Sequence, residues 1–66
     1  MKSNVLKGKM REKGIIYKDL SEKLKLCLTT VNRKINNITP FTIVETKQIK
    51  DILNLTDNEI IEIFYN

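Results

Sequence analysis

The chain has 66 residues, enough for one small domain, and we expect residues 1–66 to fold as a single unit. It contains one Cys and no His, which excludes an internal disulfide and the usual zinc sites, so no metal or other cofactor is expected. No apolar run reaches transmembrane length, and one Cys fits a reducing compartment, so we expect an intracellular protein that does not bind membranes.

Positive charge is concentrated in the first half of the chain. The net charge is +4, but residues 1–34 carry ten Lys or Arg against three acids, whereas residues 35–66 carry two against five. A basic half joined to an acidic half indicates one surface that faces a polyanion and another that faces away. An unevenly charged surface that contacts only solvent is the alternative.

The first predicted helix covers residues 4–13. Leu6 and Met10 are four residues apart and form its inner pair, because that spacing places side chains on one face of a helix. Gly14 is placed to end the helix in a left-handed cap, and Ile15 should then enter the core.

Residues 17–37 predict two short helices joined by a tight turn. Apolar side chains recur four residues apart on each helix, so each helix has one face to bury. The residues concerned are Leu20 and Leu24, then Val31 and Ile35. Leu26 lies in the turn, where it can fill the angle between the helices. Asn36-Asn37 ends the later helix of the pair, the third of the chain, because Asn tolerates the left-handed conformation.

Two capping boxes mark the starts of the last two helices. Pro40 and Phe41 form a connector that cannot be helical at the proline, and Thr42-x-x-Glu45 then opens the fourth helix. Thr56-x-x-Glu59 opens the fifth. The expected buried residues are Ile43, Ile49, Ile52 and Leu53 on the fourth helix and Ile60, Ile63 and Phe64 on the fifth. The sequence therefore predicts an all-α fold, a compact five-helix bundle.

The helix expected after the turn is unusually polar. Between its apolar anchors it carries Thr29, Thr30, Asn32, Arg33 and Lys34. Short hydrogen-bonding side chains and cations are the types that read base edges and hold phosphates. The pattern favours nucleic-acid contact, with a helix surface that only faces solvent as the alternative.

Several motifs taken together resemble the Cro and phage-repressor class (Cro/C1-type, XRE-like) of helix-turn-helix proteins. They are Arg11-Glu12-Lys13-Gly14, Leu20-Ser21-Glu22-Lys23-Leu24, Thr29-Thr30-Val31-Asn32-Arg33-Lys34-Ile35-Asn36 and Pro40-Phe41-Thr42. The resemblance covers residues 4–64. It implies a lambda-repressor-like DNA-binding domain with its helix-turn-helix at about 17–37, working in the bacterial cytoplasm as a phage or prophage transcription regulator. The third helix would enter the major groove of double-stranded operator DNA.

The same resemblance implies individual DNA contacts. The residues at base-contacting positions are Leu28, Thr29, Asn32 and Arg33, and those expected at phosphates are Tyr17, Lys18, Thr30, Lys34, Asn36 and Asn37. Arg33 could bind guanine O6 and N7, and Asn32 could pair with adenine. Arg33 could instead pair with Glu22 or Asp19 and only orient the helix.

The chain departs from the family pattern around the turn. Ile16 stands where a Thr or Ser cap is usual, and Tyr17 replaces a Gln. Lys25 replaces the turn Gly, at a cost of roughly 1–2 kcal/mol for a non-Gly residue in left-handed geometry. Cys27 replaces the cap of the third helix, a change worth about 1 kcal/mol. A redox role for Cys27 is the alternative to simple packing.

Apolar residues remain after the inner faces of the last two helices are assigned. Val44, Ile61, Phe64 and Tyr65 form a candidate patch for a homodimer on DNA, which the family resemblance also implies. The second functional class is a small protein-interaction module, such as an antirepressor that binds a phage repressor protein. No enzyme is expected, because the chain lacks His, a Gly-rich phosphate loop and a nucleophile with its base.

Overall fold

The computed structural model describes residues 1–65 and is all-helical over that range. It contains α1 (Ser3–Lys13), α2 (Tyr17–Leu24), α3 (Leu28–Ile35), α4 (Ile43–Leu53) and α5 (Asp57–Phe64). The described part of the chain measures 28 × 23 × 20 Å. The expectation of a five-helix all-α bundle is confirmed.

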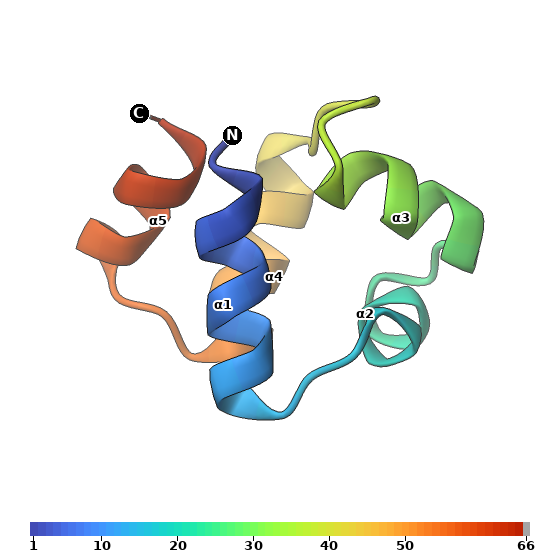
Figure 1. The fold of residues 1–66 in the computed structure, drawn as a ribbon, viewed down its shortest axis with the longest axis horizontal. Helices are drawn as coiled ribbons and strands as arrows, with labels where there is room; N and C mark the ends of the chain where they lie inside the picture. The colour runs from blue at the N-terminus through green and yellow to red at the C-terminus, as the bar shows by residue number, and fades with distance from the viewer. Residues whose placement is uncertain (66) are drawn as a thin grey trace.

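The helices are arranged around a central pair (Figure 1). α1 and α4 pack on each other in the middle, α5 packs on both of them, and α2 packs on α3 and α4. α3 packs on α1 and α2 and does not touch α5. The second and third helices therefore form one side of the molecule and α5 forms the opposite side, as Figure 1 shows.

The predicted caps set the helix boundaries. Thr42 accepts a hydrogen bond from the Glu45 N–H, and the Glu45 carboxylate accepts one from the Thr42 N–H at 2.8 Å. Thr56 and Glu59 repeat this arrangement at the start of α5. Gly14 ends α1 with φ of 71°, a left-handed conformation that costs glycine little.

A single apolar core joins all five helices. Its buried members come from every helix, and they include residues predicted from the helical spacing: Leu6, Met10, Leu20, Leu24, Val31, Ile35, Ile49, Leu53, Ile60 and Ile63. Leu55, between α4 and α5, is also buried and was not predicted. Leu26 and Phe41 pack against this core from the turn and the connector, as expected, and Ile15 is also partly buried there.

One expected core residue is wrong. Ile43 is 68% exposed. Ile43 lies six positions before Ile49, and at about 100° per residue its side chain therefore points about 120° away from the buried face of α4. Thr46 takes the inner position of that turn and is buried, and its hydroxyl donates to the Thr42 carbonyl at 3.0 Å.

Candidate nucleic-acid interface

The exposed face of α3 gathers the residues predicted to contact bases. Leu28, Thr29, Asn32, Arg33 and Asn36 are all exposed, whereas Val31, Lys34 and Ile35 form the buried face. These exposed residues recur three and four positions apart, so they form one continuous stripe along the helix. Figure 1 shows α3 at the edge of the molecule, away from α5.

Arg33 is available on this stripe. Within residues 1–65 the ion pairs join Lys9 to Glu59, Lys34 to Glu45 and Lys50 to Asp57, so Arg33 pairs with neither Glu22 nor Asp19. An exposed guanidinium with no internal carboxylate partner keeps its fork of N–H donors for a ligand. The interpretation of Arg33 as a partner of Glu22 or Asp19 is therefore wrong, and its contact with bases stays a prediction.

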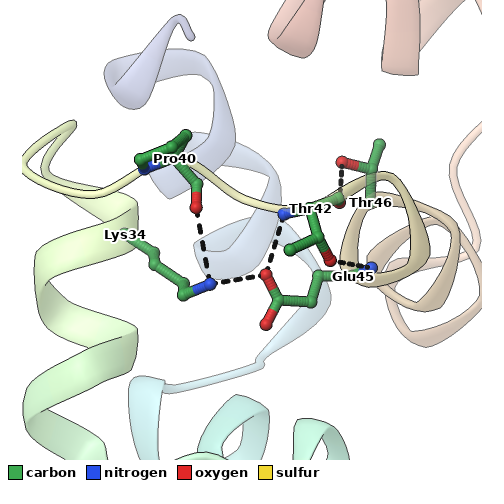
Figure 2. A network of polar contacts seen from close by, with 5 residues as sticks. All are labelled: Lys34, Pro40, Thr42, Glu45 and Thr46. Atoms are coloured by element: carbon green, nitrogen blue, oxygen red, sulfur yellow. Dashed lines mark hydrogen bonds and ion pairs between the residues drawn. The ribbon is translucent and has the colours of Figure 1, made fainter.

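Lys34 corrects the phosphate assignment made from the sequence. Its ammonium lies 2.6 Å from the Glu45 carboxylate and 3.4 Å from the Pro40 carbonyl oxygen (Figure 2). The same ammonium lies 5.9 Å from the centre of the Phe41 ring. The residue is only 8% exposed. Lys34 therefore ties α3 to the start of α4 and is not available to DNA. Its position three residues after Val31 already placed it on the buried face.

Two hydrogen-bond donors hold the Glu45 carboxylate in place. Figure 2 shows the Glu45 carboxylate between the Lys34 ammonium and the Thr42 N–H, so one oxygen serves the ion pair and the helix cap together. Partial burial opposes ionisation of Glu45, but the hydrogen bonds from Lys34 and Thr42 outweigh it and lower the pKa of Glu45. The carboxylate thus stays charged and holds α3 against α4.

The turn after α3 also differs from expectation, because its hydrogen-bond donors already have partners. The Asn36 side chain donates to both the carbonyl and the side-chain oxygen of Asn32, and Asn37 donates to the Met1 carbonyl. The backbone N–H groups of residues 36–39 are bonded to carbonyls of α3. The phosphate contact predicted for Asn36 is therefore corrected. Asn37 takes the left-handed conformation, with φ of 64°.

Lys7 is a site residue that the sequence analysis missed. Its ammonium donates to the Asn36 side-chain oxygen at 2.8 Å, which brings a cation of α1 to the end of α3. The charge count pointed to a basic N-terminal half, but no spacing along the chain connects residue 7 to residue 36. Only the packing of α1 on α3 shows it.

The start of α2 forms the second part of the site. Lys18 is exposed, and Tyr17 is half-buried with its ring against the core. Tyr17 also lines a groove of about 400 Å³ together with Lys7 and Arg11 of α1, so cations border the tyrosine. The Asp19 carboxylate accepts from the Ile16 N–H at 3.0 Å, which is the reciprocal half of a capping box, while Ile16 has no side-chain acceptor for the first-turn N–H groups of α2.

A short turn of residues 25–27 joins α2 to α3. Lys25 has φ of 57°, so a lysine occupies the left-handed position predicted for it. Cys27 makes no side-chain cap, and its thiol lies 2.9 Å from the Thr30 hydroxyl, a contact that lowers the pKa of Cys27. The backbone N–H groups of Thr30 and Thr29 in the first turn of α3 also lower the pKa of Cys27, so they lie toward its thiol.

The proposed dimer patch is mostly exposed. Val44, Ile61 and Tyr65 are 66%, 52% and 63% exposed. Phe64 differs, because it is half-buried with its ring edge-on to Phe41 at a centroid distance of 5.8 Å. Exposed Ile43 joins the patch, since it lines a cavity of about 270 Å³ together with Phe64 and Tyr65.

Residues 1–65 contain no group of three or more Cys, Asp or Glu able to hold a metal ion, and none of their helices is long and apolar enough to cross a membrane. No family model, curated protein or solved structure matches the chain.

Proposed function

We propose that the protein is a sequence-specific DNA-binding transcription regulator of the phage Cro or repressor type, with α3 inserted in the major groove of its operator. The observation that carries this proposal is the continuous exposed stripe of α3, where Thr29, Asn32 and Arg33 face outward beside a buried apolar face. A helix with this division can enter a groove while its other face holds it to the domain.

The surroundings of α3 support the same function. Lys18 and Tyr17 flank it at the start of α2, and Lys7 and Arg11 border them from α1. Cations beside a reading helix suit a phosphate backbone that borders a major groove. The five acidic residues of the second half lie in α4 and α5, and α5 lies on the side of the molecule opposite α3 (Figure 1).

Binding to DNA can be tested with Arg33 variants. The wild-type protein should select a preferred sequence from a pool of random duplexes, and its affinity should fall steeply as salt rises. Arg33→Ala should lose discrimination at one base pair, worth about 1–3 kcal/mol for a good bidentate contact. Arg33→Lys is the matched control: it keeps the charge and the salt dependence but not the fork geometry. Equal binding of every duplex at moderate salt would refute the proposal.

We further propose that the protein binds DNA as a two-fold dimer through α4 and α5. Ile43, Val44, Ile61 and Tyr65 expose apolar side chains that a second copy could cover. Sedimentation of the protein–duplex complex should give two chains per duplex. Ile61→Asp should reduce this to one chain with weaker binding, while Asn58→Asp, an exposed change on the same helix, should not.

One observation favours a protein-binding function instead. Leu28 is 52% exposed at the tip of α3, and an apolar side chain there could anchor a partner protein such as a phage repressor. Leu28→Asp should abolish capture of that partner if α3 is the docking face. A DNA-binding role predicts selection of a duplex sequence by the wild-type chain, which an antirepressor would not show.

A further inference from the structure

A chain of polar contacts runs from α1 to the reading stripe of α3. The Lys7 ammonium donates to the Asn36 side-chain oxygen at 2.8 Å. The Asn36 amide nitrogen then donates to the Asn32 carbonyl at 2.8 Å and to the Asn32 side-chain oxygen at 2.5 Å. Both amide hydrogens of Asn36 are thus used within the protein, and its oxygen is held by a cation.

This arrangement fixes which end of the Asn32 amide faces outward. An Asn side chain has an oxygen that only accepts and an NH₂ group that only donates. The Asn32 oxygen is held by a donor from Asn36, whereas no acceptor among residues 1–65 contacts the Asn32 NH₂ group. A flip of Asn32 would set its NH₂ group against the NH₂ group of Asn36, and Lys7 prevents Asn36 from flipping to relieve that conflict.

We infer that Asn36 is a specificity-determining residue that acts through Asn32, by holding its amide with the NH₂ group toward the bases. The inference rests on the proposed DNA-binding function. With this orientation Asn32 requires a base edge that accepts a hydrogen bond in the major groove, which purine N7, guanine O6 and thymine O4 provide. Asn36 itself is a positioning residue and touches no base.

The Asn36→Asp variant should reverse this preference. An Asp side chain offers acceptors only, so Asn32 would turn its NH₂ group toward residue 36 and its oxygen toward the bases. The outward oxygen would then require a donor edge, such as cytosine N4 or adenine N6. Lys7 lies where it can pair with the new carboxylate, and the backbone bonds of residue 36 are unchanged, so the fold should persist.

Selection from a pool of random duplexes tests the inference, with Asn32→Ala used to locate the base pair that Asn32 reads. At that pair, Asn36→Asp should change the preferred base by about tenfold or more, and Asn36→Ala should weaken the preference. Asn58→Asp is the matched control, because it makes the same chemical change at an exposed position of α5, a helix that does not touch α3, and it should leave that base unchanged.

The outcomes separate the inference from the proposed function. A wild-type chain that selects a sequence, together with an Asn36→Asp variant of unchanged base preference at the Asn32 pair, overturns the inference and leaves the function standing. A wild-type chain that selects no sequence refutes the function. NMR spectra of the free protein test the Asn32 orientation without DNA. Asn36→Asp should strongly shift the signals of the Asn32 side-chain NH₂ group, and unshifted signals would overturn the inference.

Discussion

The Glu45→Gln substitution should destabilise the protein strongly although it changes one atom. The Gln side chain can still accept from the Thr42 N–H, so the cap of α4 survives. What is lost is the negative charge beside Lys34, whose side chain is only 9% exposed. The neutral Gln oxygen can still accept from the ammonium, and the Pro40 carbonyl lies 3.4 Å away, but neither group balances the charge. A nearly buried cation without a counter-charge lowers the free energy of unfolding, because its lost hydration is not compensated.

The expected size follows from the burial of this pair. Breaking a fully buried pair from one side costs about 3–5 kcal/mol, and the residual solvent contact here reduces this to about 2–3 kcal/mol. For a chain of 66 residues the whole free energy of unfolding is about 3–10 kcal/mol. The midpoint of thermal unfolding should therefore fall by about 10–20 °C.

Urea unfolding followed by circular dichroism measures the effect in a double-mutant cycle. Lys34→Met removes the cation, and Lys34→Met with Glu45→Gln removes both charges and should be more stable than Glu45→Gln alone. Glu59→Gln is the matched control, because Glu59 occupies the same capping position on α5 and forms an ion pair with Lys9. The side chains of that pair are 26–27% exposed, so Glu59→Gln should lower the free energy of unfolding much less. Additive losses in the cycle would refute the reasoning.

The remaining predictions concern pH and backbone conformation. The hydrogen bond from Lys9 and the N–H of Thr56 hold the pKa of Glu59 at about 2, below its ordinary 4.5, so the native state favours the ionised form. The stabilisation from ionised Glu59 is complete above pH 4.5 and is lost as the pH falls through about 2. The free energy of unfolding, measured with urea across this window, should therefore depend less on pH in Glu59→Gln than in the wild type. An unchanged pH dependence would contradict the assignment. Gly14→Ala should destabilise by about 1 kcal/mol because of its positive φ, while Gly8→Ala, in open space within α1, should stabilise by about 0.5–1 kcal/mol. Lys25→Gly should stabilise by about 1 kcal/mol, since it relieves a left-handed lysine, and Lys23→Gly inside α2 should do the opposite.

The sequence by itself determined the local features of this protein. Caps and turn residues act within a few positions, so Thr42, Thr56 and Gly14 set helix boundaries that the structure confirms. Helical spacing likewise identified the buried faces of α2 and α3, because residues four apart share a face whatever surrounds the helix.

The tertiary structure decided which polar groups meet across helices. Lys34 belongs to α3 by sequence, but Glu45 and Phe41 lie beside it only because the connector brings α4 there, and they convert an expected DNA contact into an internal ion pair. Asn36 meets Lys7 across 29 positions of the chain, which no local pattern encodes. Spacing along a helix defines its faces, but the partner of each face depends on how all five helices pack.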